Sequence, residues 1–183
     1  MRIPILLTAT LAALAILAGS ALAGGRHTAA EPVVVKALGG MKMVPNTYFQ
    51  DEMRFSPGTI HVTSGQSLTF EFGDRETEPH TLTIVPRSAL PKTAMQAEQC
   101  RACRYATGHL KNPKAAPGDT NPIVHWVLNK GAAGLDRVGD SIAIQPGGKH
   151  KSITVRVTAK PGTTLYFLCA VHPWMQGKIV VGY

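Results

Sequence analysis

Short runs of alternating apolar and polar residues, separated by turn residues, recur along the chain. The clearest are LTFEF at 68–72, HTLTIV at 80–85 and ITVRV at 153–157. A period of two is typical of strands that bury one face. Further short runs rich in apolar or β-branched residues lie at 33–35, 59–62, 141–144, 165–168 and 178–181. Eight short strands at this spacing predict an all-β protein with a Greek-key β-sandwich.

The stretch at about 87–139 interrupts this pattern. Its first part, from Ser88 to Tyr105, contains Ala, Gln and Glu and is expected to be partly helical, whereas KNPKAAPGDTNP at 111–122 is rich in residues that break regular structure. We therefore predict one domain at 32–183 that carries a long, partly helical or irregular insertion. Loops of this length are often functional.

The N-terminus is typical of an export signal. Arg2 precedes an uncharged apolar run at 3–18, and Ala21-Leu22-Ala23 has the small-x-small pattern of a cleavage site. We predict a signal peptide at 1–23, a flexible leader at 24–31 and a periplasmic or extracellular protein with no stable membrane insertion after cleavage. The alternative is an uncleaved anchor, although the apolar run is shorter than the roughly 20 residues that span a bilayer.

Composition narrows the range of partners. The 183 residues include 19 Lys and Arg against 11 Asp and Glu, a formal net charge of +8. A basic exported protein favours partners that are acidic at the contact surface. The positive residues are scattered and belong to no recognisable nucleic-acid-binding module, so nucleic acid is not an expected partner.

Three residues with soft or borderline donor atoms lie close together near the C-terminus. Cys169, His172 and Met175 form C-x2-H-x2-M between the runs at 165–168 and 178–181. Thiolate, imidazole and thioether together favour copper, which is held in some proteins by two histidines and a cysteine with a weak axial methionine. The motif lacks only a second histidine.

The second histidine has to come from elsewhere in the chain. The candidates are His27, His61, His80, His109, His125 and His150. His80 is the best placed, because it follows Pro79 and opens the alternating run HTLTIV, where a strand would hold it rigidly at one end of a sandwich. We therefore expect one copper ion per chain, bound by His80, Cys169, His172 and Met175.

The order of these motifs resembles a known family. It runs through FSPG at 55–58, GQ at 65–66, LTFEF, EPH at 78–80, ITVRV, YFLC at 166–169 and GKIVV at 177–181. This sequence is similar to the cupredoxins, the plastocyanin and azurin family of blue copper proteins, over 32–86 and 140–183, and its ligand loop is most similar to that of amicyanins. The resemblance implies a type 1 copper site with Met175 as the axial ligand. The insertion departs from the compact family pattern and leaves the rim of the site and the partner open.

A four-ligand copper site favours electron transport over catalysis, since it leaves little room for substrate. The chain contains neither G-x-S-x-G nor H-E-x-x-H. We predict an electron carrier, not an enzyme, that cycles between Cu(II) and Cu(I); the alternative is a copper-binding or delivery protein without redox turnover. Pro173 and Trp174 are expected to form an exposed electron-transfer patch, unless Trp174 packs against the sandwich instead.

The remaining cysteines, Cys100 and Cys103, lie in the segment CRAC. In an exported chain they are expected to form a disulfide that braces the insertion. The alternatives are a second metal site and a redox dithiol. Arg104 follows in place of the histidine that covalent haem attachment requires, so haem is not expected.

Overall fold

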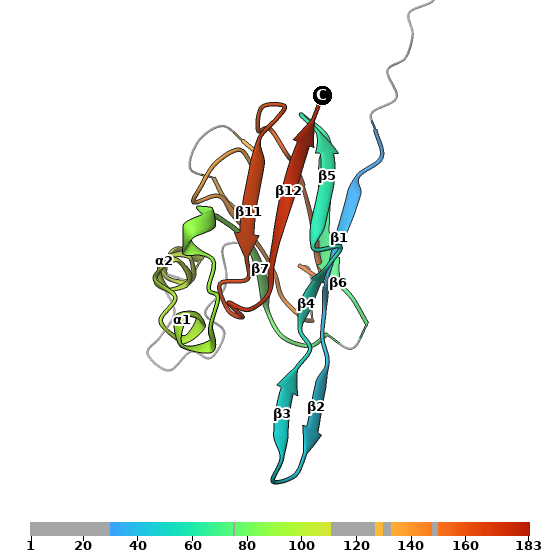
Figure 1. Ribbon diagram of the computed structural model, residues 1–183. Coiled ribbons are helices and arrows are strands. Elements are labelled where there is room, and N and C mark those ends of the chain that lie inside the picture. Colours follow the sequence, from blue (N-terminus) through green and yellow to red (C-terminus); the bar gives the residue numbers. More distant parts are fainter. Residues whose placement is uncertain (1–29, 75, 111–126, 130–132, 148–149) are drawn as a thin grey trace, which may run out of the picture.

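The computed structural model describes residues 30–74, 76–110, 127–129, 133–147 and 150–183. The predicted signal peptide at 1–23 and most of the leader at 24–31 lie outside these residues. Within the described parts, the strands form two facing sheets and a separate hairpin, and the helices lie at one side (Figure 1). None of the described helices has both the length and the apolar character needed to cross a membrane.

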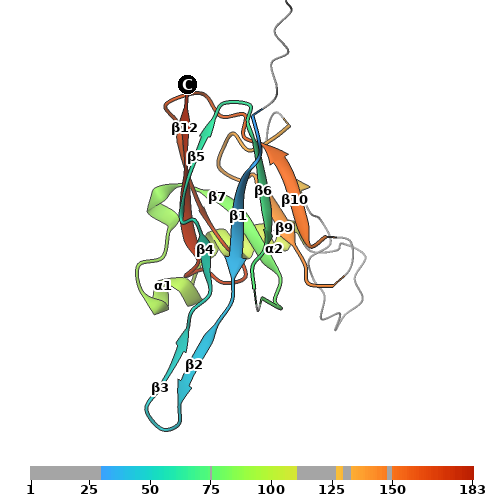
Figure 2. The ribbon, with the colours of Figure 1, turned by 90° about the vertical axis from the view of Figure 1, so that its right-hand side faces the viewer.

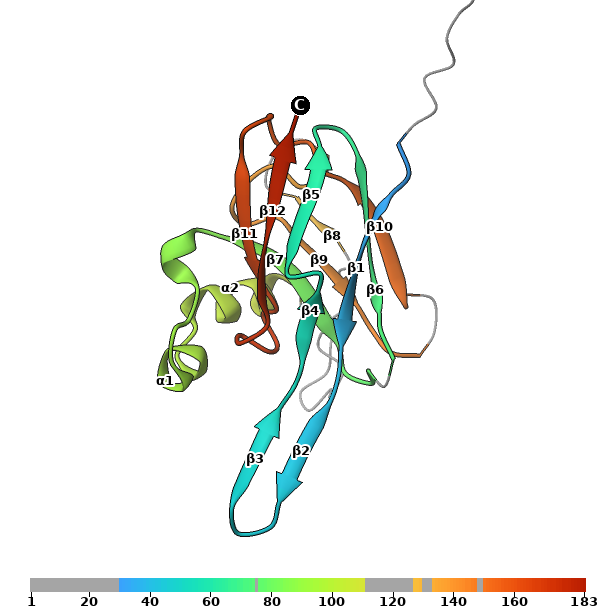
Figure 3. The same ribbon diagram turned by 45° about the vertical axis from the view of Figure 1, so that its right-hand side comes forward.

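The two sheets pack face to face as a β-sandwich (Figure 3). The first sheet has the order β10 (Ser152–Arg156), β6 (Ser67–Phe72), β1 (Val33–Leu38) and β4 (Arg54–Ser56). The second has the order β5 (Thr59–Thr63), β12 (Gln176–Gly182), β11 (Thr164–Leu168), β7 (His80–Val85), β9 (Ser141–Ile144) and β8 (Val127–Leu128). The pairs β1–β6 and β5–β12 are parallel and the other pairs are antiparallel. All eight predicted strands are present, and the predicted all-β sandwich is confirmed.

The core lies between the sheets and follows the alternation in the sequence. In β6, Leu68 and Phe70 are buried while Ser67, Thr69 and Glu71 are partly exposed. Phe55 of β4 bridges the two sheets, with its ring 5.9 Å from that of Phe70 and 4.9 Å from that of Phe167 in β11. Burial of apolar surface of this kind is the main stabilising term of such a fold.

A hairpin that the sequence did not predict extends from one end of the sandwich. It consists of β2 (Met41–Val44) and β3 (Tyr48–Asp51), and Figure 2 shows it projecting away from the sheets. Met43 and Phe49, which pair across it, are 66% and 62% exposed. Neither strand buries a face against the sandwich, so the usual alternation is missing.

The insertion begins with three short helical elements. These are η1 (Arg87–Ala89), α1 (Ala94–Glu98) and α2 (Arg101–Leu110). They overlap the segment at 88–105 expected to be partly helical, although the helices are short and α2 continues beyond it to Leu110. Thr93 caps α1, because its side chain accepts a hydrogen bond from the backbone N–H of Gln96 at 3.2 Å. The breaker-rich segment at 111–122 lies outside the described residues.

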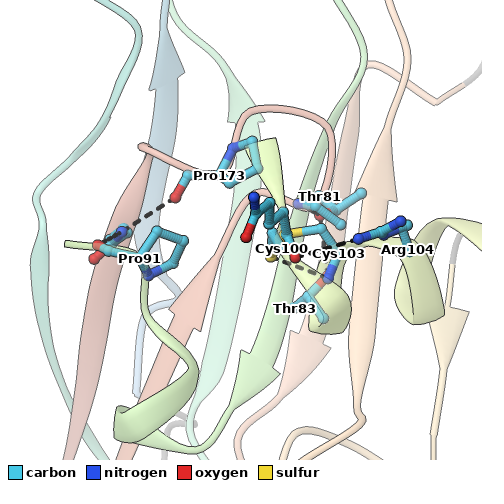
Figure 4. Close-up of a disulfide and its surroundings, with 10 residues drawn as sticks. Thr81, Thr83, Pro91, Cys100, Cys103, Arg104 and Pro173 are labelled. Atoms are coloured by element: carbon cyan, nitrogen blue, oxygen red, sulfur yellow. Dashed lines mark hydrogen bonds between the residues drawn. A yellow bond between two sulfur atoms is a disulfide. The ribbon is translucent and has the colours of Figure 1, made fainter. Parts of the chain in front are cut away.

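A disulfide joins Cys100 and Cys103 at the start of α2. Both cysteines are buried in a small apolar cluster with Val85 of β7 and with Leu168 and Ala170. Figure 4 shows the disulfide beside Thr81 and Thr83, on the face of β7 turned away from the core. The insertion is therefore packed against the outer side of the strands that lead to Cys169.

Candidate metal centre

Strand pairing brings two distant parts of the chain to one end of the sandwich. β7 and β11 run antiparallel with Leu168 opposite Thr83. His80 begins β7 and Cys169 follows the last residue of β11, so both residues lie at the same end of these two strands. The contact between the two strands continues past their paired residues, because the backbone N–H of Ala170 donates to the Thr81 hydroxyl at 2.7 Å.

The loop after β11 is closed by its own backbone. The N–H of Cys169 donates to the carbonyl of Met175 at 3.0 Å, and the N–H of Met175 donates to the carbonyl of His172 at 2.9 Å. The side-chain amide of Gln176 donates to the carbonyl of Pro173 at 3.1 Å and to that of Pro91 at 2.8 Å. The second bond ties the loop to the insertion (Figure 4).

Three donor atoms converge where these segments meet. Nδ1 of His80 lies 3.6 Å from Sγ of Cys169, Nδ1 of His172 lies 3.7 Å from the same sulfur, and the two nitrogens are 3.2 Å apart. His80 and Cys169 are fully buried and His172 is 6% exposed. These residues form a group able to hold a metal ion.

The triangle of donor atoms has the size that a first-row transition metal needs. In the plane of the three atoms, the point equidistant from them lies about 2.0 Å from each. This distance is close to the bond lengths of imidazole and thiolate to such a metal. Met175, which is 1% exposed, follows on the same loop and adds a thioether to the surroundings. The chemistry of this set, two imidazoles, one thiolate and one thioether, is that of copper electron-transfer sites.

The surroundings of Cys169 favour the thiolate that a metal requires. Burial alone would raise the pKa of the thiol, but hydrogen bonds with His172 and His80, together with their charges, lower it to about 6. The backbone N–H of Thr81 also points at the sulfur from 3.3 Å. The folded chain therefore offers a ready thiolate to a metal near neutral pH.

His172 lies at the outer edge of the group. Burial would lower the pKa of its imidazole, but the Cys169 thiolate and then the Glu78 carboxylate raise it. Nε2 of His172 is 2.9 Å from Oε2 of Glu78, and the ring centroid is 5.4 Å from that of Trp174. The His172 ring therefore lies between the buried donor atoms and the protein surface.

The predicted patch is partly open to solvent. Trp174 is 47% exposed and Pro173 is half-buried. Both border a groove of 710 Å³ whose other side is formed by the insertion, through Pro91, Lys92 and Ala97. The insertion therefore lies beside the loop at 169–175, called the copper loop below, and shapes the rim of the site.

The other candidate histidines do not join the group in the described residues. His61 is exposed on β5, and His150 lies in the turn before β10. His27 and His125 lie outside the described residues, and so does the side chain of His109 on α2.

Sequence reasoning missed two acidic residues beside the group. Glu76 and Glu78 each place a carboxylate oxygen near the outer nitrogen of one histidine. The tripeptide Glu78-Pro79-His80 was visible in the sequence, but nothing in the pattern showed that its glutamate would reach His172, 94 residues further along.

The fold and the donor set together define a class: a β-sandwich with a group of residues that fits a single type 1 copper site. Solved structures with a similar arrangement are cupredoxins. They include auracyanin A, a "blue" copper protein from Chloroflexus aurantiacus (19% identity, TM-score 0.43, covering 83% of this chain and 100% of the other). They also include a purple cupredoxin from Nitrosopumilus maritimus (11%, 0.42, 82% and 99%) and plastocyanin from the fern Dryopteris crassirhizoma (16%, 0.38, 81% and 99%).

No protein-family model and no curated protein sequence matches the chain. The structural likeness, at these identities and scores, carries no functional weight by itself. The functional assignment depends instead on the side chains of this protein.

Proposed function

We propose that this chain is an exported type 1 copper protein that carries single electrons between redox partners. His80, Cys169 and His172 are the equatorial ligands and Met175 is the axial ligand. The observation that carries the proposal is the buried triangle of two imidazole nitrogens and one sulfur, with edges of 3.2 to 3.7 Å. Bound copper would supply the Cu(II)/Cu(I) couple.

The protein supports electron transfer by holding its donor atoms in place. β7 fixes His80, β11 fixes Cys169, and two backbone hydrogen bonds close the loop that carries His172 and Met175. A framework of this rigidity keeps nearly the same ligand positions in both oxidation states, so little reorganisation accompanies the transfer. Burial excludes water from the donor atoms.

Electrons would enter and leave through the edge of His172. Its ring is next to the exposed Trp174, and encounters between redox proteins use small, transient contacts of this kind. The net charge of +8 favours a partner that is acidic at the contact surface. The export of the chain is proposed from the signal-like residues 1–23.

The disulfide bears on the alternative of copper delivery. A second copper-binding site at CRAC would need Cys100 and Cys103 as thiolates, but the structure has them joined to each other and buried. We therefore assign this pair a structural role in bracing the insertion.

The test is a visible spectrum with copper stoichiometry. Protein loaded with Cu(II) is expected to bind one copper per chain and to show intense absorption from thiolate-to-copper charge transfer. Cys169→Ser should abolish this absorption, while the matched double variant Cys100→Ser/Cys103→Ser should keep both the absorption and the stoichiometry. A colourless Cu(II) complex of the wild type would refute the proposal, and loss of one copper in the double variant would place a metal at CRAC.

A further inference from the structure

The five residues before and at the start of β7 bring two carboxylates to the two histidines. Oε1 of Glu76 lies 3.1 Å from Nε2 of His80, and Oε2 of Glu78 lies 2.9 Å from Nε2 of His172. In both rings Nδ1 faces Cys169. Each carboxylate therefore lies near Nε2, the ring nitrogen turned away from the sulfur. One short segment therefore reaches both histidines from behind.

The burial of Glu76 needs an explanation. Its side chain is 1% exposed, and burying an ionised carboxylate is costly unless it is paired. Oε1 accepts hydrogen bonds from the backbone N–H groups of Thr77 and Glu78, both at 2.8 Å, which holds the carboxylate in place. These bonds satisfy one oxygen only.

Two further atoms of the pair have no aligned hydrogen bond within the described part of the chain. These are Oε2 of Glu76 and Nε2 of His80, although the two side chains are within ion-pair distance. Glu76 and His80 are therefore in contact without an aligned hydrogen bond. A positive charge on the opposite side of the His80 ring would compensate the buried carboxylate, and that is where the three donor atoms converge.

We propose that Glu76 is a positioning residue that holds His80 with Nδ1 toward the copper and lowers the reduction potential of the site, with Glu78 acting more weakly on His172. The inference rests on the proposed function. A buried negative charge stabilises the more positive Cu(II) state more than Cu(I), and a carboxylate behind an imidazole makes it a more basic ligand. Both effects have the same sign.

The two glutamates differ in burial and should differ in strength. The side chain of Glu78 is 53% exposed, against 1% for Glu76. Solvent and salt screen an exposed charge much more than a buried one. The effect of Glu78 on the potential should therefore be smaller than that of Glu76 and should decrease as salt is added.

The experiment compares Glu76→Gln, Glu78→Gln and the control Glu31→Gln. Glu31 is exposed and lies two residues before β1, a strand that begins at the end of the sandwich opposite the copper loop (Figure 1). Redox titration followed by the visible absorption gives the ratio of Cu(I) to Cu(II) at a fixed potential. Glu76→Gln should raise this ratio at least tenfold, or about 59 mV for one electron, while Glu78→Gln should raise it less and Glu31→Gln should leave it unchanged.

The outcomes separate this inference from the proposed function. A colourless wild type refutes the proposed function, and this inference with it. A wild type with strong absorption and an unchanged potential in Glu76→Gln overturns this inference alone, as does an effect of Glu78→Gln equal to or larger than that of Glu76→Gln.

A measurement on the wild type covers the case in which Glu76→Gln does not fold. The Cu(I) protein is diamagnetic, so the carboxyl carbon of Glu76 can be observed by NMR at neutral pH. A chemical shift typical of an ionised carboxylate supports the inference, and one typical of a protonated acid overturns it.

Discussion

The sulfur of Cys169 receives one backbone N–H, from Thr81, and faces the Nδ1 atoms of two histidines. Metal and protons compete for these same three atoms. The balance between them depends on two opposite shifts: the pKa of the Cys169 thiol is lowered to about 6, and the pKa of His172 is raised. The metal-free site therefore favours a thiolate beside a protonated imidazole.

Copper affinity should accordingly depend on pH in two stages. Below pH 6 the ion displaces protons from both Cys169 and His172, and each displaced proton weakens binding about tenfold per pH unit of acidification. Above pH 6 the thiol proton is already lost, while His172 still releases its proton until its raised pKa is passed. Competition with a chelator for Cu(I) across this range measures the effect. An affinity that does not change through pH 6 would contradict it.

At the scale of elements, a period of two predicted the strands with one buried face. In β6, Leu68 and Phe70 lie between the sheets. In β7, Leu82 and Ile84 do the same, while the other face of this strand is covered by the insertion. The strands β2 and β3 were missed because Met41 to Val44 are all exposed and carry no such period. β4 and β8 have only three and two residues, too few to show one.

The candidate site could be predicted only in part for a related reason. Cys169, His172 and Met175 lie within one loop, and His80 could be chosen because it opens a strand. The contacts of Glu76 and Glu78 depend on how the residues before β7 fold back over the site, which no local pattern encodes. Charged residues in a loop are usually solvated, so the buried position of Glu76 had no signal in the sequence.

The strand that follows the copper loop depends on a glycine at its start. A Cβ at Gly177 would collide with the ring of Phe167 and lie 2.7 Å from the carbonyl of Gly58. Gly177→Ala should therefore lower the free energy of unfolding by about 1–3 kcal/mol, as overpacking does elsewhere. Urea unfolding of the metal-free protein measures the change.

Gly182→Ala in the same strand is the matched control. Its added Cβ would meet only the carbonyl of Val62, at 3.7 Å, an ordinary contact. The change in unfolding free energy should stay within about 0.5 kcal/mol. Equal losses in the two variants would show that the close packing at Gly177 is not the cause.

At the scale of the whole molecule, the copper loop and the chain end lie at opposite ends of the sandwich (Figure 1). The loop end presents Trp174 beside the groove, while the other end presents Tyr183, which is 99% exposed. The insertion borders the groove through Pro91 and Ala97. A redox partner that contacts Trp174 would therefore also meet the insertion.

Trp174→Ala should slow electron exchange with an acidic redox protein by about tenfold, the loss expected from removing one aromatic anchor. The reduction potential and the visible spectrum should remain unchanged, because Trp174 is not expected to bind the metal. Stopped-flow mixing measures the second-order rate, and Tyr183→Ala serves as the control. The rate of the wild type should fall as salt is added, and a rate that rises instead would contradict an acidic partner.

The projecting hairpin also affects how the protein withstands peroxide. Met41 and Met43 of the hairpin are 65% and 66% exposed, as is Met95 of α1 at 66%, whereas Met175 is 1% exposed. A thioether is oxidised to the sulfoxide where oxidant can reach it, and a sulfoxide no longer offers a soft sulfur donor. The hairpin methionines and Met95 would therefore be oxidised before Met175, so the first damage would spare the sulfur that the copper site is proposed to use.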